Sequence, residues 1–197
     1  PFVLGLEHRY VTISRCMKLI SKKLILDNMK YCQPNIRMGE DLTLLLPCLL
    51  DCEHLVVMDH KAYYHYLYVT ESMAHQYDKG LYENNRKLRK IINHILEEKC
   101  CNTSEITMPD YAWMLDQADR EYIFLLLLVL KNEARGNPAG YKKNIREICN
   151  APEVKELVQK TVVEIHEKSN LLLYLVLLHP NAFMIRVLRL AMILYYR

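Results

Sequence analysis

The sequence predicts a mainly helical protein with a small β component, and three observations support that fold class. Hydrophobic residues make up 51% and charged residues 25% of the 197 positions, which is the composition of a globular chain rather than a disordered one. Only five glycines are present, fewer than the tight turns of an all-β sandwich require. Helical spacing of apolar residues dominates residues 78–197, and strand-like runs occur only in residues 1–77.

The first part, 1–77, is expected to combine two helices with two strands. Apolar residues at helical spacing predict a helix over 14–28. A second apolar run predicts a helix over 41–52, interrupted or bent near its proline. The β-branched run 55–58 and the aromatic-rich run 62–69 predict buried strands.

The second part, 78–197, is expected to be nearly continuous helix with short breaks. Amphipathic spacing predicts a helix around 88–96, and Pro109 begins another that contains the nine-residue apolar run 122–130. That run predicts a buried helix and is too short to span a bilayer. After a break at 136–140 the sequence predicts a short helix that contains Ile145 and Ile148. The next helix is expected to start at Pro152, with Asn150 as its cap, and to carry an apolar stripe from Val154 to Ile165. Two last helices follow, separated by His179 and Pro180.

Charge and cysteine content argue against two classes of function. The 26 basic and 23 acidic residues are nearly balanced, whereas nucleic-acid binders usually carry a concentrated basic face. None of the seven cysteines forms a C-x-x-C pair, and Cys48 and Cys52 lie one turn apart as small core residues. We therefore expect no nucleic-acid partner, no metal site in this chain and reduced thiols, as in a cytoplasmic protein.

The most informative local feature is the sequence MGED, which ends at Asp41. Gly39 permits a tight turn, and Glu40 and Asp41 then stand at the start of a helix, where the macrodipole favours carboxylates. The sequence leaves two roles open for Asp41. One is an N-cap that accepts a bond from the backbone N–H of Thr43 or Leu44, and the other is a general base that takes a proton from a hydroxyl nucleophile.

Several motifs around this segment resemble the C-terminal half of family 2 glycosyltransferases, in particular bacterial cell-surface polysaccharide enzymes. Residues 18–25 resemble the helix before the acceptor loop, 38–59 the G-E-D segment with its helix and strand, and 62–84 the tail that closes the catalytic domain. The motifs occur in the family's order over about residues 10–90. Because the chain starts with Pro1 and lacks an Asp-x-Asp motif and a Gly-rich phosphate loop, we expect the nucleotide-binding part to lie upstream.

This resemblance implies that 1–77 is the acceptor-side end of a GT-A α/β domain and that 78–197 is a helical tail bundle. The implied reaction transfers a sugar, with inversion, from a nucleotide-sugar to a hydroxyl of a saccharide or lipid-linked acceptor in surface-polysaccharide synthesis. Asp41 is then the base and Glu40 its neighbour. A divalent Mn or Mg ion would belong to the full-length enzyme, and this chain alone is expected to be inactive.

Four more residues are candidate substrate contacts, each with a structural alternative. Lys18 precedes the acceptor loop, but a solvated helix position is the alternative. His65 lies among tyrosines, where a histidine of the core or its rim is the alternative. Ser72 and His75 lie where the resemblance places the end of the catalytic domain, and His75 is a candidate for contact with a diphosphate or metal.

The last expected helix carries Arg186, Arg189 and Arg197 on one narrow face, and almost all its other residues are apolar. This pattern is typical of a helix that lies on a membrane surface, here the inner face of the cell membrane. The alternatives are a helix packed in the tail bundle and a contact within a homo-oligomer. For the whole chain, the competing function is a non-catalytic helical interaction or membrane-docking module.

Overall fold

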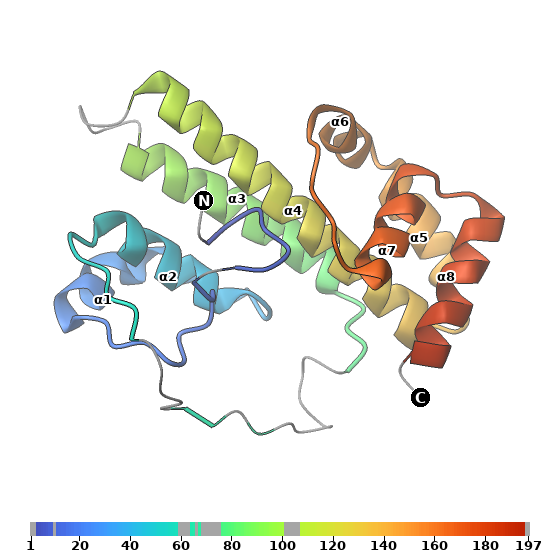
Figure 1. Ribbon diagram of the computed structural model, residues 1–197, viewed down its shortest axis with the longest axis horizontal. Coiled ribbons are helices and arrows are strands. Elements are labelled where there is room, and N and C mark those ends of the chain that lie inside the picture. Colours follow the sequence, from blue (N-terminus) through green and yellow to red (C-terminus); the bar gives the residue numbers. More distant parts are fainter. Residues whose placement is uncertain are drawn as a thin grey trace.

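The computed structural model describes residues 3–9, 11–58, 64–65, 67, 76–100 and 107–195. Every regular element within these residues is a helix (Figure 1). The elements are α1 (Lys22–Asn28), η1 (Met29–Tyr31), α2 (Glu40–Asp51), α3 (Leu81–Cys100), α4 (Met108–Gly136), α5 (Tyr141–Asn150), α6 (Pro152–Lys160), α7 (Lys168–Leu178) and α8 (Ala182–Tyr195), of which η1 is a short 3-10 helix.

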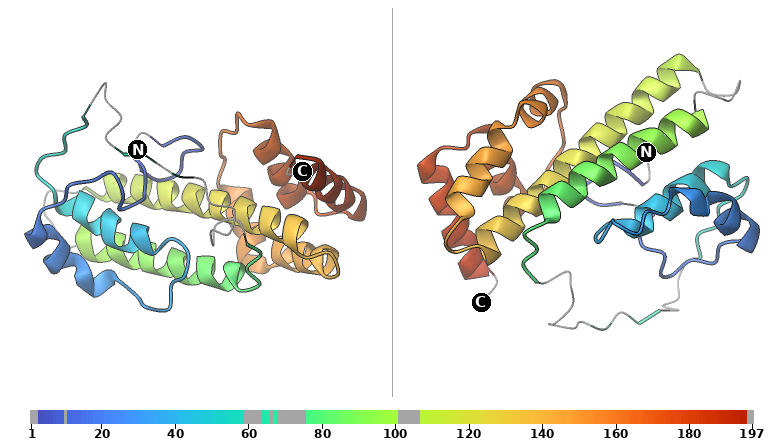
Figure 2. Two further views of the ribbon diagram at one scale, coloured as in Figure 1. Left: turned by 90° about the horizontal axis from the view of Figure 1, so that it is seen from below. Right: turned by 180° about the vertical axis from the view of Figure 1, so that it is seen from behind.

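The long helices α3 and α4 run antiparallel, side by side, and the other elements pack on this pair (Figures 1 and 2). Helix α2 packs on α3, and α1 packs on α2. Helices α5, α7 and α8 gather around the C-terminal half of α4 (Figure 1). The candidate catalytic residues therefore lie on one side of the long pair, and the helical tail covers one end of it.

The larger core lies between α4 and the four helices that follow it. The apolar run 122–130 supplies the α4 side of this core. Its predicted burial is confirmed for most of the run, but Phe124 and Leu125 are half-buried and Leu128 is 40% exposed. The fully buried members of this core include Ile123, Leu126, Leu130, Ile145, Leu157, Leu173, Val176, Ile185 and Leu188.

A smaller core joins α2 to the long helix pair. Leu42 and Leu46 of α2 pack with Leu88, Ile92 and Ile95 of α3. The N-terminal segment and α4 also contribute side chains. The division expected after residue 77 thus falls just before α3, and the elements on either side of it share a core.

The β component of the predicted fold is wrong for the described residues, and so is the assignment of 1–77 to a GT-A α/β domain. Residues 55–58 form no strand, and their four apolar side chains are 57–82% exposed. Residues 64–65 and 67 are not in a strand, and the rest of 62–69 lies outside the described residues. An extended segment becomes a strand only when a neighbouring strand takes its backbone hydrogen bonds, and the described chain contains none.

The first predicted helix is also shorter than expected. It was expected over 14–28 but begins at Lys22, because the side chain of Ser21 caps it by accepting from the Leu24 N–H at 3.2 Å. The residues before the cap are irregular, and Met17 has a φ of +61°, which is rare for a residue with a side chain. Apolar spacing alone did not reveal this break.

The expected stripe from Val154 to Ile165 is interrupted in the same way. Helix α6 ends at Lys160, so residues beyond it leave the helical spacing, and Val162 is 70% exposed. Its N-cap is Ala151 and not Asn150, whose side chain instead donates to the carbonyl oxygen of Arg146 at 2.7 Å. The helix expected over 41–52 is present as α2, but Pro47 lies inside it and does not interrupt it. The break at 136–140 and the last two helices agree with the structure.

Candidate functional site

The expected base, Asp41, is the second residue of α2, and a glycine turn sets its position. Gly39 is the N-cap, with a φ of +86°, and its carbonyl accepts from the Leu42 N–H at 3.0 Å. A Cβ at residue 39 would lie 2.5 Å from Cδ2 of Leu88 on α3. Both the backbone angle and the close packing therefore require glycine at this turn.

The carboxylate of Asp41 binds Arg15, which lies in the irregular segment before α1. The Arg15 backbone N–H donates to Oδ2 at 3.1 Å, and the Arg15 side chain donates to Oδ1 through Nε. The same guanidinium lies 3.7 Å from Oε1 of Glu40. Asp41 thus binds a distant loop, and the cap position belongs to Gly39, so the N-cap role for Asp41 is wrong.

Arg15 does not use all the acceptor capacity of this carboxylate. An ionised carboxylate offers about four lone-pair sites, and Arg15 takes one on each oxygen. The side chain of Asp41 is 25% exposed and that of Glu40 is 43% exposed. Asp41 can therefore accept one further hydrogen bond from a hydroxyl that approaches from solvent.

Lys18 lies in the same segment and close to Asp41. Its ammonium group donates to Oγ1 of Thr12 at 2.8 Å and to the carbonyl oxygen of Ser14 at 2.7 Å. Burial lowers the pKa of Lys18, while the negative charge of Asp41 acts in the opposite direction. Lys18 is therefore held by the segment and adds positive charge beside the carboxylate pair.

Cys16 is a further member of this group that the sequence did not single out. Its thiol is exposed and hydrogen-bonds with Tyr64, and this bond, with a second from Ser14, lowers the pKa of Cys16. Tyr64 belongs to the aromatic run that was expected to be a strand. The contact places part of that run beside the irregular segment that holds Arg15.

The structure thus brings together only some of the predicted site residues. Lys18, Glu40 and Asp41 share one site. His65 is exposed, and within the described residues the hydrogen bonds to the Asp41 carboxylate come from Arg15. Ser72 and His75 lie outside the described residues.

Arg15 was missed as a site residue because nothing in its own neighbourhood marks it. It lies 26 positions before its partner, in a stretch that was expected to be helical. Its partner becomes visible only when the loop folds over the start of α2. The sequence offered one signal for Arg15 as a site residue, namely that it is a second cation in the segment that contains Lys18.

A cleft of about 330 Å³ lies beside this site. Met38, Gly39 and Leu42 form one wall, and side chains of α4 such as Phe124 and Lys131 form another. The residues that line it include neither Glu40 nor Asp41. The same glycine turn therefore borders the cleft and positions the carboxylates.

The donor groups at this site do not fit a divalent cation. Within the described residues no three His, Cys, Asp or Glu side chains come together as metal ligands. Glu40 and Asp41 both face the guanidinium of Arg15, whose positive charge opposes a second cation there. We therefore assign no metal ion to these two carboxylates.

The three arginines expected on one face of the last helix have different environments. Arg189 donates to the carbonyl oxygens of Ala134 and Arg135 at the end of α4, the latter at 3.0 Å, and lies 5.3 Å from the ring of Tyr141. Arg186 is exposed, and Arg197 lies outside the described residues. Among the helices of the described chain, none has the length and apolar character needed to cross a membrane.

Comparisons with known proteins were made at the level of families, sequences and structures. No family model, no curated protein and no solved structure matched this chain. The family and reaction implied by the sequence motifs therefore stay predictions, and any functional proposal depends on the geometry around Asp41.

Proposed function

We propose that this chain is the acceptor-side part of an inverting glycosyltransferase and that Asp41 is its general base. One observation carries the proposal: the carboxylate of Asp41 is oriented by Arg15 on both oxygens, yet remains a quarter exposed at the start of α2. A carboxylate that merely capped its helix would bind the backbone of that helix instead. The sequence resemblance around MGED supports the same role.

In the proposed reaction, Asp41 accepts the proton of an acceptor hydroxyl. The hydroxyl oxygen then forms a bond to the anomeric carbon of a nucleotide-sugar while the bond from that carbon to the diphosphate oxygen breaks. The leaving nucleoside diphosphate carries away the electron pair, and attack from the opposite face inverts the anomeric carbon. Arg15 contributes as a positioning residue that orients the carboxylate through its backbone N–H and its guanidinium, and Lys18 holds the segment that carries Arg15.

The acceptor is a saccharide or a lipid-linked saccharide, and the proposed donor site belongs to residues outside this chain. The isolated chain is therefore expected to release no nucleoside diphosphate from nucleotide-sugars. Isothermal titration of the isolated chain with UDP-glucose and with GDP-mannose, in the presence of Mn²⁺, should show no heat of specific binding. A micromolar affinity would contradict this placement of the donor site.

The decisive test is Asp41→Asn in the polypeptide from which the chain comes. Asn keeps the size of Asp and its single oxygen can still accept one of the two Arg15 hydrogen bonds, but it cannot take a proton, so turnover should fall by roughly 10²–10⁴-fold. Turnover is measured as nucleoside diphosphate released from a panel of nucleotide-sugars. The free energy of unfolding is measured in parallel by urea titration.

The matched control is Asp27→Asn, which removes another exposed carboxylate that is paired with a single lysine, Lys23. Its turnover and stability should stay within twofold and about 0.5 kcal/mol of the unsubstituted protein. Near-normal turnover of Asp41→Asn would leave Asp41 as a structural partner of Arg15 and would refute the proposed role.

A further inference from the structure

The cleft beside the glycine turn has walls from parts of the chain that lie far apart in the sequence. Its volume is about 330 Å³, and most of the residues that line it are apolar. The N-terminal segment forms one side, the turn before α2 another, and α3, α4 and α7 the remainder. Small-molecule sites usually measure about 300–1,000 Å³. A cleft at the lower end of this range, walled by several elements, admits a small molecule and not the surface of a folded protein.

Apolar side chains of α4 stay in contact with water where this helix borders the cleft. Leu128 is 40% exposed and Phe124 is half-buried, although both belong to the apolar run 122–130 and most of that run is buried. The two residues lie one turn apart, so they share a face of α4, and both line the cleft. Met38 of the glycine turn also lines the cleft and is likewise half-buried. An apolar ligand would therefore remove all three side chains from water, which favours its binding.

Two carboxylates line the cleft, and donors of the protein already bind both. Glu7 accepts from Asn170 at 2.7 Å and from backbone N–H groups just before α7. Glu121 is fully buried, accepts from the Gly5 N–H at 3.1 Å and pairs with Arg9. These contacts also hold the N-terminal segment in place as a wall of the cleft. Because both carboxylates have partners, the cleft does not require a cationic ligand.

Two cations of the cleft favour an acidic ligand. The side chain of Arg9 is 24% exposed and pairs with Glu121 through Nη2, while its Nε is buried and has no acceptor among the described residues. A buried donor without an acceptor is unfavourable, and an acid group in the cleft would meet this guanidinium. Lys131 also lines the cleft and neighbours Leu128 on the surface of α4. Positive charge therefore adjoins the exposed apolar side chains.

We propose that the cleft is a binding site for a small amphiphilic acid, a molecule with one apolar tail and one carboxylate group. The tail packs against Met38, Phe124 and Leu128, and the carboxylate accepts hydrogen bonds from Lys131 and Arg9. A neutral apolar molecule would fill the same space but would leave the donors of Arg9 unused. This proposal rests on the cleft alone and does not depend on glycosyl transfer.

The test is isothermal titration of the chain with octanoate and, separately, with the neutral probe 1-octanol. Octanoate should bind at one site per chain with a dissociation constant of about 1 mM or lower. It should bind roughly tenfold more tightly than 1-octanol, because only octanoate offers a carboxylate to Lys131 and Arg9. Its affinity should fall as salt shortens the range of the charge interaction.

Two variants separate the apolar contribution from the charged one. Leu128→Gln should weaken octanoate binding roughly tenfold, since a polar side chain of similar size replaces the exposed apolar one. Lys131→Gln should remove most of the preference for octanoate while leaving the affinity for 1-octanol within about twofold. Thermal melting verifies that both variants are folded.

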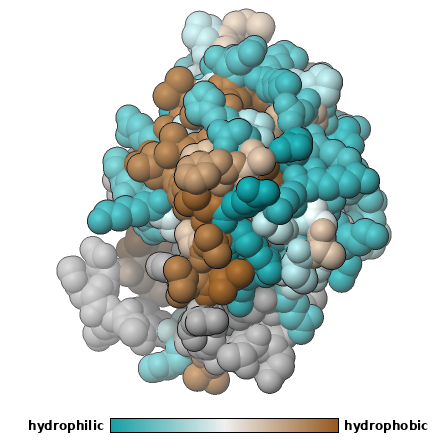
Figure 3. All heavy atoms as spheres, turned by 90° about the vertical axis from the view of Figure 1, so that its right-hand side faces the viewer, coloured by the Kyte–Doolittle hydropathy of each residue, from teal (hydrophilic) through white to brown (hydrophobic). Residues whose placement is uncertain are grey.

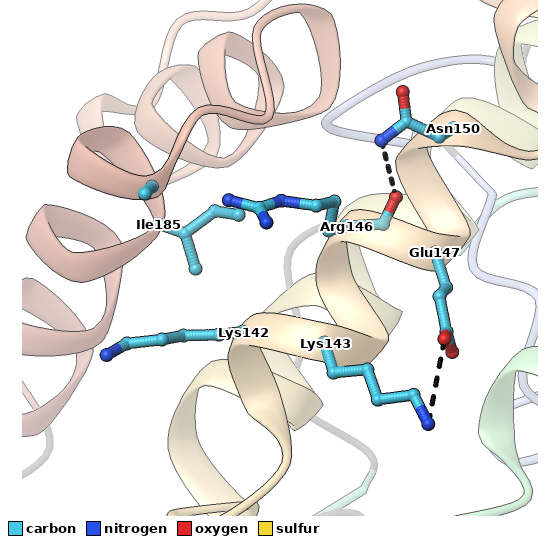
Figure 4. A pocket seen from close by; sticks show the side chains of 7 residues that line it. Lys142, Lys143, Arg146, Glu147, Asn150 and Ile185 are labelled. Carbon is cyan, nitrogen blue, oxygen red and sulfur yellow. Dashed lines mark hydrogen bonds and ion pairs between the residues drawn. The ribbon is translucent and has the colours of Figure 1, made fainter.

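Two other surfaces supply matched controls for binding in the cleft itself. Figure 3 looks onto the end of the molecule that holds α8 and shows a band of hydrophobic side chains, and Leu190 and Leu194 of α8 are 62% and 70% exposed. Figure 4 shows a hollow of about 480 Å³ between α5 and α8, where Lys142 and Arg146 extend from α5 toward α8. Leu190→Gln with Leu194→Gln, and Lys142→Gln with Arg146→Gln, should each bind octanoate like the unsubstituted chain.

Several outcomes would overturn the proposal. If octanoate gives no heat of specific binding, or binds no more tightly than 1-octanol, the cleft does not recognise an amphiphilic acid. If a control pair weakens octanoate binding and Leu128→Gln does not, the probe binds elsewhere on the surface. If sedimentation velocity without probe finds a dimer that Leu128→Gln converts to a monomer, a second copy of the chain covers the cleft instead.

Discussion

Buried charge in this protein holds together segments that lie far apart in the sequence. Glu121 of α4 is fully buried, accepts from the Gly5 N–H at 3.1 Å and pairs with Arg9, so it ties the N-terminal segment to α4. Glu133 is nearly as buried and accepts from three side chains, Tyr77, Asn137 and Asn144. Buried carboxylates are tolerated only with such partners, so these contacts specify where each segment lies.

Asp51 at the end of α2 leads to a prediction about pH. Burial acts to raise the pKa of Asp51, but hydrogen bonds from Lys99 at 2.6 Å and Asn28 at 2.9 Å outweigh it, and the net pKa is lowered from 3.8. A lowered pKa in the folded state means that the charged form stabilises the fold. That contribution is fully present above pH 3.8 and is lost as the pH falls through the lower pKa of the folded protein.

The corresponding experiment compares Asp51→Asn with the unsubstituted chain by urea titration between about pH 6 and pH 3. At about pH 6 the variant should be less stable by about 1–2 kcal/mol, the size expected for hydrogen bonds to a charged group. The difference between the two proteins should shrink steadily below pH 3.8. A difference that stays constant over this range would mean that Asp51 contributes through packing and not through its charge.

At the scale of single elements, α2 depends on the glycine that precedes it. Gly39→Ala forces a positive φ on a residue with a side chain and pushes its Cβ against the buried Leu88. We expect a loss of about 2–3 kcal/mol in the free energy of unfolding, measured by urea titration, because strain and a steric clash add. Gly80→Ala is the control, since residue 80 has no positive φ and meets only Asp78 Oδ1 at 3.3 Å. Equal stability of the two variants would contradict this account of the turn.

The contact between α8 and α4 gives a second prediction at this scale. Arg189 supplies hydrogen bonds to carbonyls in the last turn of α4, which have no partner within that helix. Arg189→Gln should therefore lower the melting temperature and cost about 1–2 kcal/mol in stability. Arg186→Gln on the exposed side of the same helix should stay within about 0.5 kcal/mol. A similar loss of stability in both variants would show that the hydrogen bonds of Arg189 to α4 do not account for its contribution to stability.

Elements that bury one face were predictable from the sequence, and elements that depend on distant partners were not. The apolar spacing of α3 and the long apolar runs of α4, α7 and α8 mark these helices in the sequence, because each helix buries its own side chains in a core. The run 55–58 has the composition of a strand, but composition does not supply a neighbouring strand. For the site, Asp41 could be identified from MGED, whereas Arg15 could not, because their contact spans 26 positions of chain.

For the whole molecule, α4 connects the two cores. Ala118, in the N-terminal half of α4, belongs to the smaller core. Ile123 and Leu130, further along the same helix, belong to the larger one. Leu125 packs against both clusters. Because one continuous helix carries residues of both cores, neither core can lose its α4 side chains without disturbing the other. The chain is therefore expected to unfold as one unit.

Trp113 makes this cooperativity measurable. It is the only tryptophan, lies near the start of α4 and is 42% exposed, beside residues that pack on the smaller core. Its fluorescence and the far-UV circular dichroism should give the same midpoint in urea. Leu177→Ala, a truncation in the larger core, should cost about 2–5 kcal/mol and lower both midpoints together, as should Ile92→Ala in the smaller core. A Trp113 transition that does not move in Leu177→Ala would mean that the two cores unfold independently and that α4 does not couple them.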